Sequence, residues 1–206
     1  MPSSAVEFLR EEGSRHVTRE PLMRNPIDYL LEEHAEIMAR VADLRRALSD
    51  LEARGPAALP EAMPAFTAAS RMMSTTLVRH AKKEDEALFP ALEAAWGRVD
   101  GTPTAIMRME HSKIHNRVNL LQETLRRLNA VEHPAIVSRG AELRDAVEGS
   151  ADAEALERVG GEIVRLLEMH FGKEEAVLFP MAREVLDPGT LADVMRRIEE
   201  IAAASA

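Results

Sequence analysis

Two stretches ninety residues apart place a histidine four residues before a glutamate and then end in the same Leu-Phe-Pro. The first begins at His80 and is HAKKEDEALFP, and the second begins at His170 and is HFGKEEAVLFP. Because residues four apart share one face of a helix, each stretch would aim an imidazole and a carboxylate in one direction. Imidazole nitrogen and carboxylate oxygen suit iron, manganese or zinc, so these stretches predict metal binding.

A single histidine–glutamate pair at this spacing carries little weight, since another occurs at His16 in a polar segment. The longer match is more specific: residues 77–90 and 167–180 are identical at seven of fourteen positions, namely Leu, His, Lys, Glu, Leu, Phe and Pro. A fainter match relates EEHAEI around His34 to MEHSKI around His111. The chain therefore resembles two copies of a helix pair, each with one lone histidine and one His-x-x-x-Glu.

The flanking residues predict that these groups point toward a core. The apolar neighbours at helical spacing are Leu77, Ala87, Leu88, Leu167, Val177 and Leu178. Four imidazoles and two carboxylates would be costly in a dry core without a compensating partner, and a metal is such a partner. If Glu84 and Glu174 lie on opposing helices, each could bridge two ions on a bundle axis. A ferritin-type site is excluded, because no histidine here has a glutamate three residues before it.

Four long segments with helical periodicity would position these residues. They are about residues 26–53, 64–96, 103–128 and 152–186, with a further helical piece at 135–148. Asn25-Pro26 and Thr102-Pro103 are each a capping residue followed by proline, which is typical of a helix start. RGPAALPEAMP predicts a loop, and Pro90 predicts a kink or a stop.

Short connections between four long helices favour an all-α fold, an antiparallel up-down-up-down four-helix bundle. The expected organisation is an N-terminal arm over residues 1–24, the bundle over 25–187 and a short amphipathic C-terminal helix within 188–206. Aromatic residues make up only 3% of the chain, which also favours helices over strands.

Composition excludes several classes of function. The net charge of −9 with interspersed basic residues argues against a nucleic-acid groove or an anionic membrane surface. The absence of cysteine excludes disulfides, iron–sulfur clusters and thiolate metal sites. No apolar run approaches the roughly 20 residues that span a bilayer. Acidic residues stand where a signal peptide would be apolar, so the expected location is cytoplasmic.

The ordered set H…HxxxE…H…HxxxE, with LFP after the second and fourth elements, resembles the hemerythrin-like HHE cation-binding family over about residues 26–182. The resemblance implies a cofactor of two non-haem iron ions, joined by an oxo or hydroxo bridge. It implies iron ligation by His34, His80, His111 and His170, with Glu84 and Glu174 as bridging carboxylates.

His115 lies four residues after His111, where oxygen-carrying hemerythrins also have a second histidine. That resemblance implies one iron held by His111, His115 and His170. The other iron would be held by His34 and His80 and would keep an open position for a small ligand such as O₂. The alternative is that His115 lines the pocket or packs as an uncharged residue, as the methionine at its repeat position does.

The second carboxylate has two candidates. Oxygen-carrying hemerythrins place it five residues after the histidine, which here is Glu175, whereas Glu174 preserves the internal repeat. Five residues turn about 140° and four about 40° on a straight helix, so both cannot face the metal. We favour Glu174 and expect Glu175 and Asp85 to be exposed neighbours. Glu33 and Glu110 would point about 100° away from the adjacent histidines, and the lesser alternative is that either one orients a ligand histidine.

The resemblance implies a di-iron protein that binds or reacts with O₂, peroxide or NO. A second hypothesis is an iron- or oxygen-responsive sensor or iron-homeostasis module without turnover, since metal binding energy can become folding energy. A third is a bundle without metal or with structural zinc, although structural zinc usually takes four ligands. The sequence does not decide between a carrier and a peroxide- or NO-reactive oxidoreductase, and it indicates no protein partner.

Overall fold

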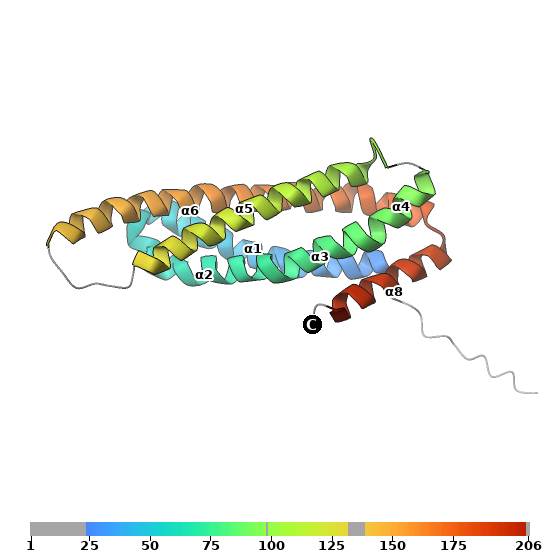
Figure 1. Ribbon diagram of the computed structural model, residues 1–206, viewed down its shortest axis with the longest axis horizontal. Helices are drawn as coiled ribbons and strands as arrows, with labels where there is room; N and C mark the ends of the chain where they lie inside the picture. Colours follow the sequence, from blue (N-terminus) through green and yellow to red (C-terminus); the bar gives the residue numbers. More distant parts are fainter. Residues whose placement is uncertain (1–23, 98, 132–138, 205–206) are drawn as a thin grey trace, which may run out of the picture.

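The computed structural model covers the 206-residue chain, and the structure describes residues 24–97, 99–131 and 139–204, with side chains described outside 129–152 (Figure 1). All the long elements in these ranges are helices, and no strand occurs there. None of the described helices is both long and apolar enough to span a membrane.

Four helical rods lie side by side along the long axis of the molecule (Figure 1). The first and third rods are single helices, α1 (Pro26–Arg54) and α5 (Pro103–Val131). The second and fourth are interrupted by π-helical turns, and their parts are α2 (Leu59–Met72), η2 (Met73–Leu77), α3 (Val78–Lys83), η3 (Glu84–Leu88) and α4 (Phe89–Trp96), then α6 (Arg139–Lys173), η4 (Glu174–Leu178) and α7 (Phe179–Val185). A last helix, α8 (Pro188–Ala204), lies beside α3 in Figure 1.

The ends of the rods follow the expected chemistry. The Asn25 side chain accepts a hydrogen bond of 2.8 Å from the Ile27 N–H at the start of α1. Gly97 ends α4 with a φ of 65°, a left-handed conformation that glycine adopts without steric cost.

Two predicted connections differ from the structure. The expected loop after α1 is a single 3₁₀ turn, η1 (Gly55–Ala58), and α2 begins at Leu59, before the predicted start. Pro60 sits in the first turn of α2, where a missing N–H costs nothing. The helical piece expected at 135–148 is not separate, because residues 139–148 form the beginning of α6; residues 132–138 lie outside the described part.

The repeated Leu-Phe-Pro is where the second and fourth rods widen into π-helical turns. The N–H of Phe89 donates to the carbonyl of Glu84, and that of Phe179 donates to the carbonyl of Glu174, each five residues back. The next residue is proline, which has no N–H and whose ring crowds the carbonyl four residues back. The wider turn accommodates the proline, and the helix continues. Such turns occur frequently at functional sites.

The interior contains two apolar clusters with a polar layer between them. One cluster includes Ile37, Leu77, Ile114 and Leu167, and the other includes Leu30, Leu88, Met107 and Leu178. Each rod contributes to both clusters, and its histidine lies close to the change from one cluster to the other; on the fourth rod Phe171, which follows His170, still belongs to the first cluster. The rods therefore bring their histidines to one level of the bundle.

Helix α8 packs on the second cluster through its apolar face, which consists of Val194, Met195, Ile198 and Ile201. It contacts α1, α3 and η3. The division into arm, bundle and C-terminal helix stays a prediction, and residues 1–23 of the predicted arm (1–24) lie outside the described residues.

Candidate metal centre

The polar layer is built from six side chains on all four rods, five of them buried and the sixth, His111, 10% exposed. His34 lies on α1, His80 on α3, His111 on α5 and His170 on α6. The remaining two are Glu84 and Glu174, the first residues of two π-helical turns, and both side chains are 0% exposed.

These side chains form two groups that share both carboxylates. One group is His34, His80, Glu84 and Glu174, and the other replaces the two histidines by His111 and His170. Within each group the ligand atoms lie within 4.8 Å of one another. The structure thus places side by side two sets of ligand atoms, each compact enough to hold one metal ion.

Each carboxylate spans both groups. Glu84 Oε1 lies 3.4 Å from His80 Nε2, while its Oε2 lies 3.3 Å from His111 Nε2. Glu174 Oε2 lies 3.4 Å from His34 Nε2, while its Oε1 lies 3.3 Å from His170 Nε2. A carboxylate with one oxygen toward each group is arranged as a bridging ligand would be.

Six atoms of this layer are buried and have no hydrogen-bond partner among the side chains that the structure describes. They are both carboxylate oxygens of Glu84, both of Glu174, Nε2 of His111 and Nε2 of His170. An unsatisfied buried polar atom costs about 1–3 kcal/mol, so six in one place call for a common partner. All six are metal-ligand atoms with no thiolate among them, so a cation fits the set.

A close contact between two ring nitrogens also supports metal binding by the first group. His34 Nε2 and His80 Nε2 are 2.9 Å apart. Two ligands at right angles on one ion, with metal–nitrogen bonds of about 2.1 Å, would be separated by roughly 3 Å. The pair is therefore spaced for a shared ion.

The other ring nitrogen of every histidine faces a carboxylate from another helix. The Nδ1–carboxylate distances are 2.8 Å for His34–Glu175, 3.1 Å for His80–Glu33, 3.1 Å for His111–Asp85 and 3.2 Å for His170–Glu110. A carboxylate accepts a hydrogen bond, so each Nδ1 carries the hydrogen, and a neutral ring leaves Nε2 bare for a metal. These four partners orient the rings toward the centre.

Sequence reasoning considered an orienting contact only for Glu33 and Glu110, as the lesser alternative, and expected none from Asp85 or Glu175. We expected Asp85 and Glu175 to be exposed neighbours, and their side chains are partly exposed, yet each also holds a histidine. Glu33 and Glu110 were expected to point away from the adjacent histidines; they contact histidines on other rods instead. The internal repeat contained the signal, because all four acidic residues occupy repeated positions.

Two lysines complete this outer arrangement. Lys83 donates to Glu33, and Lys173 donates to Glu110 at the equivalent place in the repeat. Lys83 is buried and also donates to the Tyr29 hydroxyl at 3.0 Å. The pKa of both Glu33 and Glu110 is lowered: burial opposes ionisation, but the histidine and lysine contacts outweigh it. Both carboxylates are therefore held as acceptors.

The four ring pKa values separate into two kinds. Burial, together with the charge of a neighbouring histidine, lowers the pKa of His34 to about 4 and also lowers that of His170. Burial opposes charge on His80 as well, but the Glu84 carboxylate raises its pKa to about 9. Burial is likewise outweighed at His111, where the hydrogen bond from Nδ1 to its carboxylate partner raises the pKa to about 10.

The two shared carboxylates, Glu84 and Glu174, also differ. Burial disfavours charge on Glu84, but the adjacent His80 and His111 hold its pKa well below the usual value. Burial and the negative charge of Glu84 raise the pKa of Glu174 well above the usual value. Without a metal, the rings of His80 and His111 therefore each hold a second proton at neutral pH, and Glu174 is the carboxyl group of the pair that gives up its proton less readily.

Metal uptake should consequently release protons. Ligation needs bare ring nitrogens and ionised carboxylates, so filling both positions at pH 7 should release the second protons of His80 and His111, at least two per chain. Metal affinity should therefore rise as pH increases toward the raised pKa values of His80 and His111, and it should fall on acidification. Titration calorimetry in buffers of different ionisation enthalpy measures how many protons are released. Uptake without proton release would contradict these charge states.

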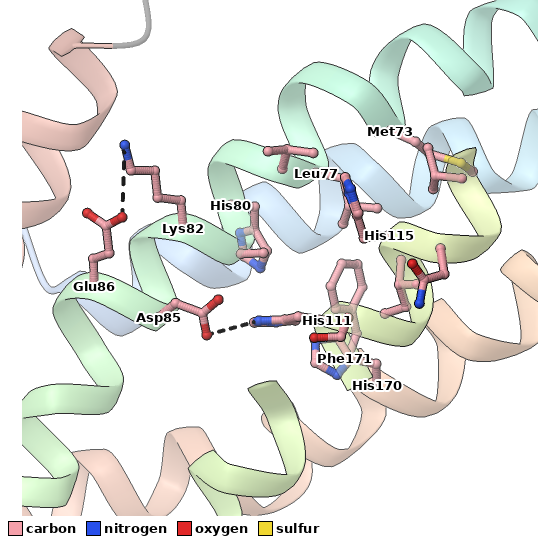
Figure 2. Close-up of a pocket in the computed structure, with 16 residues that line it drawn as sticks. Met73, Leu77, His80, Lys82, Asp85, Glu86, His111, His115, His170 and Phe171 are labelled. Carbon is pink, nitrogen blue, oxygen red and sulfur yellow. Dashed lines mark hydrogen bonds and ion pairs between the residues drawn. The ribbon is translucent and has the colours of Figure 1, made fainter. Parts of the chain in front are cut away.

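His115 is the predicted ligand that the structure does not bring into either group. Its side chain is exposed and lies at the edge of a groove beside the layer, one helical turn beyond His111 (Figure 2). The two groups lie at the level of the bridging carboxylates, and that extra turn carries the ring past them. Its ligation stays a prediction.

The orienting role of the outer carboxylates can be tested at Glu175, the most exposed of the four. Glu175→Gln replaces the carboxylate acceptor of His34 by a neutral amide of the same size, whose oxygen is a weaker acceptor, and Glu175 is 47% exposed, so the fold should tolerate it. Losing the carboxylate should lower metal affinity, by up to the roughly 10–100-fold typical of such partners. Competition with a chelator measures the affinity. Glu86→Gln, on the equivalent π-helical turn and exposed, is the control and should bind as the unaltered protein does. Equal affinity in both variants would contradict the assigned role.

The comparison with protein families agrees with this geometry. The family model described as the hemerythrin HHE cation binding domain matches residues 25–132 and again residues 130–204. No curated protein matches the chain. The two family matches together span all four rods and α8, which is most of the chain. The protein therefore belongs to the hemerythrin HHE cation-binding domain family.

Proposed function

We propose that this protein is a non-haem di-iron protein that binds or reacts with O₂, peroxide or NO. The two ions would be held by His34, His80, Glu84, His111, His170 and Glu174. The observation that carries the proposal is the convergence of six unpartnered, buried ligand atoms in two groups with shared carboxylates. The membership of a cation-binding family supports it.

Iron is the metal that the donor set favours. Structural zinc usually closes at four protein ligands in one tetrahedral site, whereas here six residues serve two adjacent positions. Nitrogen and carboxylate donors without sulfur also suit iron. We further propose that the rods follow the antiparallel up-down-up-down order and that the protein works in the cytoplasm.

The residues of the chain would prepare this centre in three ways. The four outer carboxylates orient the rings and keep Nδ1 protonated. The two apolar clusters, one on each side of the polar layer, limit the access of water. Glu84 and Glu174 bring negative charge into a dry environment and so favour cations. Bound iron would supply redox chemistry and open positions for a small ligand.

Metal analysis with an optical spectrum tests the proposal. Two irons per chain, with the charge-transfer bands of a bridged ferric pair, would support it. The reduced protein should then be exposed separately to O₂, H₂O₂ and NO. A stable and reversible oxygenated form would favour carriage or sensing, and rapid oxidation with peroxide consumption would favour an enzyme. A protein that retains only zinc, or no metal, would overturn the proposal.

A further inference from the structure

The two halves of the metal layer differ at a pair of equivalent positions directly beside the histidines. His34 and His111 correspond in the internal repeat, and so do Ala81 and Phe171, each the residue directly after the histidine of a His-x-x-x-Glu. One half thus has a phenyl ring where the other has a methyl group. This difference determines how well neighbouring side chains shield His34 and His111 from solvent.

Phe171 covers His34. The two rings stack with centroids 3.9 Å apart and an interplanar angle of 14°. Phe171 is itself buried, and only 1% of His34 is exposed. The centre is therefore closed on this side by an aromatic side chain.

At the equivalent place beside His111, the small Ala81 leaves a groove between α3 and α5. Its volume is about 520 Å³, and its lining includes Ala81 and three of the four metal-layer histidines, His80, His111 and His170. The side chain of His111 is 10% exposed. Figure 2 shows His80, His111 and His170 together at this groove, with Phe171 among them.

The groove is larger than a diatomic ligand needs. A water-sized molecule occupies about 30 Å³, whereas pockets for small organic molecules begin near 300 Å³. One part of the lining is apolar, with Met73, Leu77, Ile114 and Val118, and another part is polar, with Ser112, His115 and Asn116. This combination suits a compact organic molecule with one apolar face.

We propose that the groove over Ala81 is the site where external ligands enter and bind the metal centre, on the side of His111. The ligands it takes include small organic molecules that carry a metal-binding nitrogen or oxygen atom. This inference rests on the proposed di-iron function. It places the open side at His111 and His170, whereas the resemblance to oxygen carriers implied an open position on the ion of His34 and His80.

The test is to close the groove with the residue that closes the other side. Ala81→Phe puts a ring beside His111, as Phe171 lies beside His34. The probes are azide and imidazole, added to the ferric protein and followed optically. Because entry would then require the ring to move first, association of both probes should slow roughly tenfold or more. Iron removal by an external chelator should slow as well.

The matched control is Ala35→Phe, which adds the same ring at an exposed position next to His34, on the closed side. It should leave all three rates unchanged. Ala81→Val and Ala81→Leu give a graded series if the phenylalanine variant folds poorly, as judged by circular dichroism, and the rates should fall with side-chain size. The double variant Ala81→Phe/Phe171→Ala should recover fast association, because it moves the opening to His34.

The outcomes separate this inference from the proposed function. A protein without two irons refutes the di-iron proposal itself. A protein with two irons, whose probe rates are the same in Ala81→Phe and Ala35→Phe, refutes the groove as the entry site. Fast azide association together with no imidazole binding in the unaltered protein refutes the assignment of organic ligands.

Discussion

Glu84→Gln should leave a folded protein that no longer holds a pair of metal ions. One oxygen of Glu84 faces His80 and the other faces His111, so a neutral amide removes an anionic ligand from both positions at once. The loss in affinity should exceed the roughly 10–100-fold typical of an outer partner. Metal analysis after equilibration with limiting iron, alongside chelator competition, measures it.

The structure offers a matched control for this variant. Glu86→Gln makes the same chemical change two residues later, on the same π-helical turn but at an exposed position. It should retain two ions. In the metal-free protein, Glu84→Gln should also lower the pKa of His80, because the Glu84 charge is what raises it to about 9. Retention of both ions at unaltered affinity would exclude Glu84 as a bridging ligand.

Metal loading should strongly stabilise the fold. The six unpartnered atoms are a local cost in the metal-free protein, and a ligand that binds only the folded state stabilises it by mass action. At a free metal concentration a thousand times Kd, the gain is about 4 kcal/mol per site. A chain of this size gains about 2–4 °C in Tm per kcal/mol, so one filled site should raise Tm by roughly 8–16 °C. Thermal unfolding followed by circular dichroism measures the shift.

The same measurement distinguishes two of the functions considered from the sequence. A carrier or enzyme should keep its helical signal at room temperature without metal, whereas an iron-responsive sensor should lose helicity or become sensitive to proteases. Glu84→Gln is the control, and its Tm should respond much less to iron. Equal melting temperatures with and without metal would show that the polar layer is not a metal site.

The sequence alone selected seven candidate ligands, and six of them lie in the layer, whereas His115 does not. A helix repeats every 3.6 residues, so His80 with Glu84 and His170 with Glu174 must share a face wherever the helix packs. Most of the apolar residues around them marked that face as the inner one, whereas Val177, within the π-helical turn, is 49% exposed. The internal repeat then linked His34 with His111 and indicated a second position of the same kind.

Several features depended on how the rods pack against one another. Each outer carboxylate contacts a histidine on a different rod, and periodicity within one helix cannot predict such a contact. The π-helical turns also change the direction of later side chains: Glu174 lies in the layer, and Glu175 reaches His34 across the bundle. On a straight helix these neighbours would have pointed about 100° apart with only one of them useful.

The side of the centre that is open was likewise decided by the tertiary structure. The repeat contains Ala81 and Phe171 at equivalent positions, but only packing shows that the phenyl ring stacks on His34 and that the methyl group leaves His111 beside a groove. The sequence determined which ligand atoms meet, because helical spacing fixes their direction. The tertiary structure determined what orients and covers them, because those contacts join side chains from different helices.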